Sequence, residues 1–262
     1  MKKLLLGSAL LVVACSNTTN VHMQLAESFV SGSESIPVKR SMWMQSKEPM
    51  TIGGYEVVAF HDAKKTHVRS DDITPPYVPS DVSGGVRQVE SRTKQSVRFD
   101  LKEGGADRWH ADCETQANGE GVKAERIGLD VPLRDKADTV CTLDGADGAR
   151  WTLNLWRYSH GVSPLSIKGE LTDGTTTYDV MPVYRFTSTR DSSRSFELPA
   201  PLGFTLTSGD TVVTAVDQIA STHGTMMLAA NADPRQKSLF AATWAAVLLQ
   251  LEERGGGTTI GR

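Results

Sequence analysis

The sequence has few cysteines, few aromatic residues and no large excess of charge of one sign. Its 262 residues include three cysteines, 6% aromatic residues, and 28 Lys and Arg against 31 Asp and Glu, which gives a formal net charge of −3. Phosphate binding needs clustered basic side chains, so this mildly acidic balance argues against nucleic acid as a partner. The chain also lacks a G-x-S-x-G elbow and a His/Glu metal-binding set, and we therefore predict a non-catalytic protein with no metal and no cofactor.

Long hydrophobic runs are scarce and lie near the two ends of the chain. The first is in residues 1–14, MKKLLLGSALLVVA, where Lys2 and Lys3 precede an uncharged stretch. A membrane-spanning helix needs about 20 apolar residues, so this run is too short to cross a bilayer. The layout predicts a secretory signal peptide that is removed from the mature protein.

The segment Val12-Val13-Ala14-Cys15 resembles the lipobox of bacterial lipoproteins. The resemblance implies that the Cys15 thiol receives a diacylglycerol, that the chain is cut before it, and that the new amino group is acylated, for example with palmitate. The alternative is an ordinary cleaved signal followed by a chance cysteine. Ser16 stands where an Asp would favour the inner membrane, so in a Gram-negative source we expect an outer-membrane anchor facing the periplasm. In any other source the expected place is the extracytoplasmic side of the cell membrane.

Two cysteines remain once Cys15 carries lipid. Exported chains fold in an oxidising compartment, and we therefore predict a disulfide between Cys113 and Cys141. A metal or redox role would favour a C-x-x-C spacing or neighbouring histidines, which this pair lacks. The pair closes a loop of 141 − 113 = 28 steps, for which the chain-entropy model gives about 3 to 4 kcal/mol of stabilisation.

The middle of the chain has the pattern of short antiparallel strands. Residues 15–40 are polar and weakly periodic, so we expect a lipidated N-terminus and flexible tether, with a turn or two of helix within 21–30. A single β domain is expected over 41–254, because runs rich in β-branched and aromatic residues alternate with Gly, Asp and Ser turns. Residues 62–85 are polar and proline-rich, and a long loop is expected there.

The C-terminal region predicts a helix over 234–254. Asp233 suits the N-cap, Pro234 the first helical position, and Gln236 the return bond to the cap. Residues 239–249, LFAATWAAVLL, are apolar on every side, so this helix must be buried on every side. Because mainly strands are available to bury it, we expect an antiparallel meander closed into a barrel around the helix, followed by a flexible tail over 255–262.

This pattern resembles the tubby-like fold, which tubby proteins share with the phospholipid scramblases and the plant LURP-one-related proteins. The resemblance is carried by residues 212–253, which look like the last two strands and the core helix of that fold. No diagnostic motif is matched, and no phosphoinositide-binding residue can be placed on this chain. The alternative architecture is a β-sandwich or a lipocalin-like barrel with the helix packed outside.

Aromatic residues concentrate in the predicted strand 151–156 and directly after it, where Trp151, Trp156 and Tyr158 form a candidate contact surface. Aromatic residues on strands are usually core, which is the competing interpretation. Other chemistry-bearing residues have ordinary explanations: His110 and Asp112 fit a hydrogen-bonded surface pair, and Ser159 and His160 fit a turn. A polar stretch offers His61, Asp62, His67, Asp71 and Asp72, but loops are commonly rich in such residues.

Three functions remain open at this point. The first is a non-catalytic, membrane-anchored envelope lipoprotein whose β domain binds a protein partner, a lipid or the membrane surface. The second is a structural subunit of an envelope or secretion assembly, and the third is an envelope hydrolase. A barrel filled by its helix would leave little room for a lipid and would favour binding of a protein partner.

Overall fold

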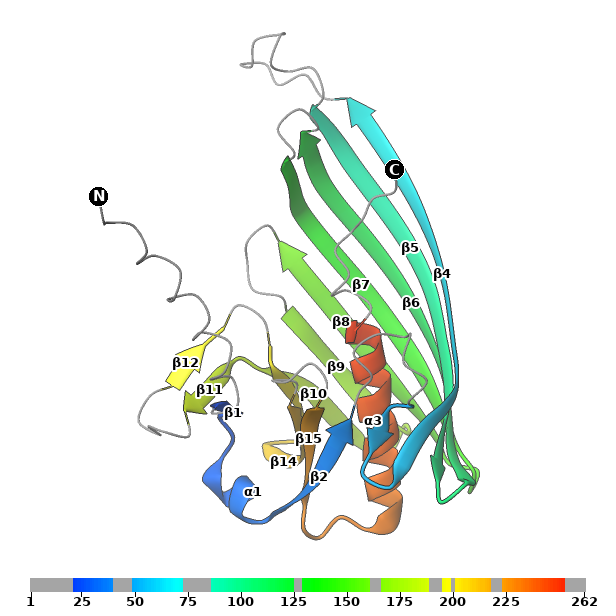
Figure 1. Cartoon of the computed structure of the whole chain (residues 1–262), viewed down its shortest axis with the longest axis vertical. Coiled ribbons are helices and arrows are strands. Elements are labelled where there is room, and N and C mark those ends of the chain that lie inside the picture. The colour runs from blue at the N-terminus through cyan, green and yellow to red at the C-terminus, as the bar shows by residue number, and fades with distance from the viewer. Residues whose placement is uncertain are drawn as a thin grey trace, which may run out of the picture.

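A computed structural model of the protein describes residues 21–39, 49–72, 86–124, 129–160, 166–188, 195–198, 201–217 and 223–252. Within them the chain is mainly β and ends in a long helix (Figure 1). The strands are β1 (Val21–Met23), β2 (Ser33–Lys39), β3 (Thr51–Ile52), β4 (Tyr55–Asp72), β5 (Val86–Glu103), β6 (Ala106–Ala124), β7 (Leu129–Gly145), β8 (Arg150–His160), β9 (Ser166–Thr172), β10 (Thr177–Val183), β11 (Arg185–Ser188), β12 (Ser195–Glu197), β13 (Gly203–Ser208), β14 (Thr211–Asp217) and β15 (His223–Ala229). The helices are α1 (Glu27–Ser31) and α3 (Pro234–Glu252).

Twelve of these strands form a closed antiparallel barrel in the order β10-β13-β14-β15-β2-β3-β4-β5-β6-β7-β8-β9. From β2 to β10 each strand pairs with the next one in the chain, as expected for a meander. The barrel closes where β15 pairs with β2 and where β10 pairs with β13. The prediction of a mainly β protein with a closed antiparallel barrel is confirmed.

Helix α3 begins where its capping residues predict. The Gln236 amide donates to the Asp233 carboxylate at 2.8 Å, and the Asp233 amide donates to the Gln236 side-chain oxygen at 3.1 Å. This reciprocal pair satisfies two backbone donors that the first helical turn leaves free. The helix starts at Pro234 and is described as far as Glu252, so the predicted end at residue 254 lies outside the described residues.

The barrel wall surrounds α3, and the helix is buried on all sides. Ala242, Trp244 and Val247 have no exposed surface, and Leu249 is 9% exposed. The one polar group of the Trp244 ring, its indole N–H, donates to the hydroxyl of Thr214 on β14 at 3.1 Å. A helix packed outside a β-sandwich or a lipocalin-like barrel would leave one of its faces exposed to solvent. The alternative of a helix packed outside is therefore wrong.

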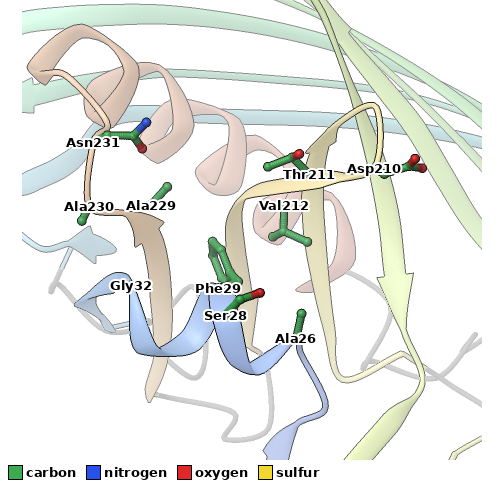
Figure 2. Close-up of a pocket in the computed structure, with 10 residues that line it drawn as sticks. All are labelled: Ala26, Ser28, Phe29, Gly32, Asp210, Thr211, Val212, Ala229, Ala230 and Asn231. Atoms are coloured by element: carbon green, nitrogen blue, oxygen red, sulfur yellow. The ribbon is translucent and has the colours of Figure 1, made fainter.

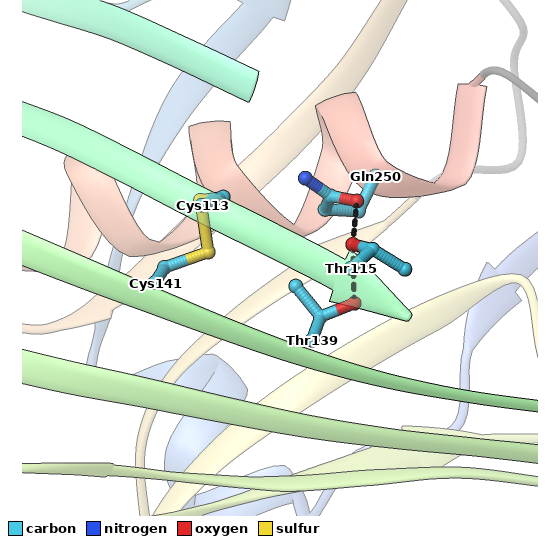
Figure 3. The surroundings of a disulfide bond; sticks show 5 residues. All are labelled: Cys113, Thr115, Thr139, Cys141 and Gln250. Atoms are coloured by element: carbon cyan, nitrogen blue, oxygen red, sulfur yellow. Dashed lines mark hydrogen bonds between the residues drawn. A yellow bond between two sulfur atoms is a disulfide. The ribbon is translucent and has the colours of Figure 1, made fainter. Parts of the chain in front are cut away.

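The predicted disulfide is present and joins neighbouring strands. Cys113 on β6 and Cys141 on β7 lie directly opposite each other and are fully buried (Figure 3). One row further along the same strands, Thr115 donates to the Gln250 side chain of α3 at 2.9 Å, and its hydroxyl shares a 2.8 Å hydrogen bond with Thr139. This polar row lies where the apolar part of the helix ends.

Four strands continue well beyond that row. We call this part the extension and define it as residues 61–72 of β4, 86–94 of β5, 116–124 of β6 and 129–138 of β7. In Figure 1 these strands rise above the end of α3 as a curved sheet. None of the residues of the main apolar core belongs to the extension, so its strands are held together mainly by backbone pairing.

The extension corrects the expectation of a loop over 62–85. Residues 62–72 continue β4 and pair with β5 as far as Asp72 opposite Arg87; residues 73–85 lie outside the described part. The polar sequence misled the prediction because neither face of this sheet packs against an apolar core, so no apolar alternation is required.

The expected flexible tether is also corrected for residues 21–39. These residues form β1, α1 and β2, and β2 is a full barrel strand that pairs with β15 along seven residues. Its burial pattern contains one buried residue, Val38, which explains why the sequence shows little periodicity there. The barrel therefore begins at Ser33 rather than near residue 41.

A second, three-stranded sheet in the order β1-β11-β12 packs on the barrel. Met23 of β1 and Phe186 of β11 are buried in a small cluster with Ala215 of β14. Met23 lies directly over Gly203 of β13, where any side chain would collide with the methionine sulfur. This close approach fixes the start of the described chain against the barrel wall.

Candidate functional site

Strand β8 carries the predicted aromatic surface. Because successive side chains of a strand point to opposite faces, the three aromatic residues do not all lie on the same face. Leu153, Leu155 and Arg157 point into the barrel, whereas Trp156 and Tyr158 point outward. Trp156 is 46% exposed and Tyr158 is 48% exposed. Large aromatic side chains on the outer wall are not needed for the core, so they are available for contact with another molecule.

Trp151 does not belong to that surface. It lies on the inward side of β8, where its ring stacks on Tyr178 at a centroid distance of 5.8 Å. Tyr178 in turn meets Phe240 of α3 edge to face at 5.4 Å. Of the three predicted residues, the structure brings Trp156 and Tyr158 together and assigns Trp151 to the core.

The outward pair has an apolar neighbour and a charged rim. Val140 of β7 is 49% exposed and lies diagonal to Trp156, because it pairs with Asn154 two residues earlier on β8. Asp138 is directly opposite Trp156 and forms a 2.9 Å ion pair with Lys136. We call Trp156, Tyr158 and Val140 the β8 patch.

The composition of the β8 patch is typical of protein contact surfaces. Tyr and Trp combine a large apolar area with one polar group, and they are enriched at interfaces. The Lys136–Asp138 ion pair is partly exposed, with 61% and 43% of the two side chains accessible, and such a pair adds selectivity rather than affinity. The sequence analysis did not identify Val140 as part of this surface, because Val140 lies sixteen residues before Trp156 (156 − 140). Only the pairing of β7 with β8 places it beside Trp156.

A shallow pocket of about 250 Å³ lies at the N-terminal end of α3. Its walls include Trp109, Trp151, Tyr178, Leu239, Arg150 and Arg235. Both arginines are already engaged, Arg150 with Asp144 at 2.6 Å and Arg235 with Asp147 at 2.9 Å. The hydrogen bond to Asp144 raises the pKa of Arg150.

Asp173 contributes a carboxylate to the same pocket. The backbone amides of Thr176 and Thr175 donate to it at 2.7 and 2.9 Å, and these bonds lower its pKa. The pocket therefore has an aromatic wall and charged groups that are already paired, which suits structural closure of the barrel end.

A second pocket, of about 450 Å³, lies between α1, the β13–β14 turn and the end of β15 (Figure 2). Ala26 and Phe29 contribute from α1, and Val212 and Ala229 contribute from the strands. Asp210 at the turn is the charged residue of the lining. Figure 2 shows that the lining combines small or apolar side chains with the polar side chains of Ser28, Asp210, Thr211 and Asn231.

The histidines and acids considered for a metal are spread apart. His110 bonds to Asp100 at 2.7 Å, and Asp112 pairs with Arg98 at 3.0 Å, as expected for hydrogen-bonded surface groups. The residues from His61 to Asp71 lie along one extended strand, where ten steps cover about 33 Å. In the described parts of the chain no three metal-ligating side chains come together.

Ser159 and His160 do not form a nucleophile and base pair. Both lie at the end of β8 rather than in the expected turn, with Ser159 on the inward side and His160 exposed on the outer side. Neighbouring residues of a strand point to opposite faces, so the two side chains diverge.

One largely buried ion pair was not predicted from the sequence. Arg157 points inward from β8 and its guanidinium donates to Asp135 of β7 at 3.2 Å. The Arg157 side chain is 10% exposed and the Asp135 side chain 32%. The pair borders the inner face of the extension and anchors β7 to β8 there, a role that only the register reveals.

In the described part of the chain, every helix falls short of the length or the hydropathy that a membrane crossing requires. Among the described residues, the β8 patch brings two exposed aromatic side chains and an exposed valine together on one face. Comparison of the chain with protein-family models, with curated proteins and with solved structures finds no significant match.

Proposed function

We propose that the protein is a non-catalytic lipoprotein of the bacterial envelope, anchored through Cys15, whose barrel binds a protein partner through the β8 patch. The observation that carries the proposal is that α3 fills the barrel while Trp156 and Tyr158 face outward. In the helix-filled half of the barrel, the described side chains leave no space for a lipid or another apolar ligand, so we place binding on the outer wall.

The outer wall favours a protein over a small molecule. The pockets at the N-terminal end of α3 and beside α1 are shallow, and small-molecule sites usually enclose most of their ligand. Exposed aromatic residues inside a charged rim instead match the anchors of protein interfaces, where Trp and Tyr commonly contribute most of the binding energy.

The anchor is supported by the lipobox pattern and by the position of β1. Val21 is 21 − 15 = 6 residues after Cys15, so the chain between them spans at most about 20 Å. A lipid on Cys15 would hold the barrel close to the membrane rather than on a long tether. A partner bound at the β8 patch would then be another envelope component near the same surface.

The patch is tested by photo-cross-linking in intact cells. A benzophenone amino acid in place of Trp156 should give one dominant cross-linked product, which mass spectrometry then identifies. The matched control is Met181 on β10, which is 41% exposed and also faces outward. Co-purification of the identified partner should be lost in Trp156→Ala and kept in Met181→Ala; equal products at both positions contradict the assignment.

The anchor is tested separately by Cys15→Ser. The variant should leave the membrane fraction as a soluble or uncleaved form, because the lipid on this thiol is the only anchor that we infer. A variant that is still processed and still membrane-bound contradicts the lipoprotein assignment.

A structural subunit of an envelope assembly is the second candidate, and the free edge of β4 favours it. The Val57 amide still donates to the Met50 carbonyl on the β3 side, and among the described residues β4 has a strand neighbour on one side only from Val58 onward. An open strand edge can accept a strand from another chain. In an assembly built this way, the amides of 61–71 would become protected from hydrogen exchange, and unchanged exchange would argue against it.

A further inference from the structure

The three-stranded sheet exposes two large apolar side chains on its outer strand. Phe196 of β12 is 52% exposed, and Leu198, two residues further on, is 41% exposed. The Leu198 amide donates to the Tyr184 carbonyl at 3.0 Å, so the strand pairing continues to this residue. Residues two apart on a strand share a face, and we call Phe196 and Leu198 the β12 surface.

The face that carries the β12 surface is buried elsewhere in the same sheet. Phe196 is in register with Phe186 of β11, which is 1% exposed, and Phe186 is in register with Met23 of β1. Near β1 this face packs on the barrel. At β12 the same face is about half exposed, because Phe196 is 52% exposed.

The charged side chain of β12, Glu197, and its partner Arg185 on β11 lie on the opposite face. Arg185 pairs with Glu197 at 3.7 Å, and both side chains are about two thirds exposed, at 68% and 67%. Because Glu197 lies between Phe196 and Leu198, alternation directs its carboxylate away from the β12 surface. The surface is thus apolar on one side of the strand and solvated on the other, as expected for a contact with an apolar medium.

The start of the chain places this sheet near the inferred lipid. β1 begins six residues after Cys15 (21 − 15), so the lipid lies within about 20 Å of Val21. β12 is two strands away from β1 in the order β1-β11-β12, which corresponds to about 10 Å across the sheet. Figure 1 shows β1, β11 and β12 together on one side of the molecule, whereas β4 and β5 lie on the other side.

From these observations we infer that the side chains of Phe196 and Leu198 insert into the interfacial region of the membrane that holds the Cys15 lipid. This inference rests on the proposed lipid anchor. The partner of the surface is a lipid bilayer, because the short connection keeps β12 within reach of the headgroups whichever protein binds elsewhere. Two contacts, the lipid and the β12 surface, would fix the orientation of the barrel on the membrane where one flexible anchor would not.

The test uses the full lipidated protein reconstituted in phosphatidylcholine vesicles that contain phosphatidylglycerol. Phe196→Cys introduces a lone thiol, since Cys113 and Cys141 are bonded and Cys15 carries lipid, and this thiol is labelled with the polarity-sensitive dye NBD. Val68→Cys is the matched control, because Val68 is 42% exposed and lies in the extension.

The dye at position 196 should brighten severalfold on vesicles and lose at least half of its emission when brominated lipids are included. The dye at position 68 should show neither change. In the unmodified protein, hydrogen exchange of 195–198 should slow at least fivefold on vesicles relative to detergent, which keeps the test independent of the labelled variant.

Three outcomes would overturn the inference, and they can be told apart. If mass spectrometry finds the lipid on Cys15 but the dye at position 196 stays unquenched like the dye at position 68, the β12 surface does not touch the membrane and the lipid anchor stands. If no lipid is found on Cys15, both the anchor and the membrane contact fail. A dye that is shielded in cells but not on vesicles would assign the surface to a protein and would also reject the membrane.

Discussion

The strands β4 to β7 are continuous, but their two halves differ in composition and in what they contact. In the barrel half, inward positions of β5 are Val97, Phe99 and Leu101, all at most 1% exposed against the core. In the extension, the inward positions of the same strand are Thr93, Ser91, Val89 and Arg87, all of which are partly exposed. The change from buried apolar to partly exposed inward side chains occurs at the hydrogen-bonded row of Thr115, Thr139 and Gln250, where the apolar part of α3 ends.

The comparison shows that α3 determines where the hydrophobic core stops. An antiparallel sheet keeps its backbone bonds with or without an apolar partner, so the strands can continue after the helix has ended. Without the helix there is no reason for large apolar side chains to point inward. The barrel half should therefore hold most of the stability, and the extension should tolerate changes that the barrel does not.

The largest contrast is expected for a carboxylate placed in each half. Ala242→Glu should unfold the domain, because an unpaired buried carboxylate costs several kcal/mol, which is comparable with the whole stability of a domain. Ala63→Glu, on the exposed outer face of β4, should change the free energy of unfolding by less than about 0.5 kcal/mol. Urea unfolding measures both, and a folded Ala242→Glu variant would reject the filled barrel.

The disulfide should contribute the next largest effect. Replacing Cys113 and Cys141 together by Ala should lower the free energy of unfolding by about 3 to 4 kcal/mol, mainly because the unfolded chain gains freedom. Thermal unfolding under oxidising conditions provides the measurement. Since the two sulfurs are bonded to each other and buried, the native, unreduced protein should not react with thiol reagents at these positions. Rapid labelling of either cysteine contradicts this account.

A threonine pair in each half gives a finer comparison. Thr115→Val should cost about 1 to 2 kcal/mol, because it leaves the buried Gln250 oxygen and Thr139 hydroxyl without their partner. Thr66→Val breaks a similar 3.2 Å contact with Thr93, but that pair is exposed and water can replace it, so a change under about 0.5 kcal/mol is expected. Equal effects in urea unfolding would remove the distinction between the halves.

The smallest effect concerns the bulge that separates the halves of β4. The register of β4 shifts between Val58 and His61, and Ala59 there has φ of 52°, in the left-handed region. This conformation costs a residue with a Cβ about 1 to 2 kcal/mol. Ala59→Gly should therefore stabilise the protein slightly, whereas Ala63→Gly in regular strand should destabilise it by about 0.5 to 1 kcal/mol. A destabilising Ala59→Gly contradicts this explanation of the bulge.

The sequence predicts the barrel half better than the extension for a physical reason. The helix could be predicted because Asp233, Pro234 and Gln236 cap it and its residues are apolar on every side. The disulfide could be predicted because residues 1–14 have the pattern of a signal peptide, and exported chains fold in an oxidising compartment. The extension could not, because residues 62–72 bury nothing and so lack the alternation that identifies a strand.

The candidate site was predictable only in part. Aromatic density along residues 151–158 pointed to β8, but the division between inward Trp151 and outward Trp156 and Tyr158 depends on which face meets α3. Val140 joins the patch through strand register, which one sequence does not specify. The sequence also did not predict that residues 21–39 are part of the folded domain. The reason is related, since β2 is stabilised mainly by pairing with β15 rather than by burial.

The central claim is that the helix-filled half of the barrel is the core and that the extension depends on it. Native-state hydrogen exchange tests this within single strands. The amides of 97–101, 109–113 and 139–143 should exchange only through global unfolding, whereas those of 66–71, 87–91 and 119–123 should exchange through local opening at a free energy well below the global value. Equal protection along the full length of β4 to β7 would contradict the claim.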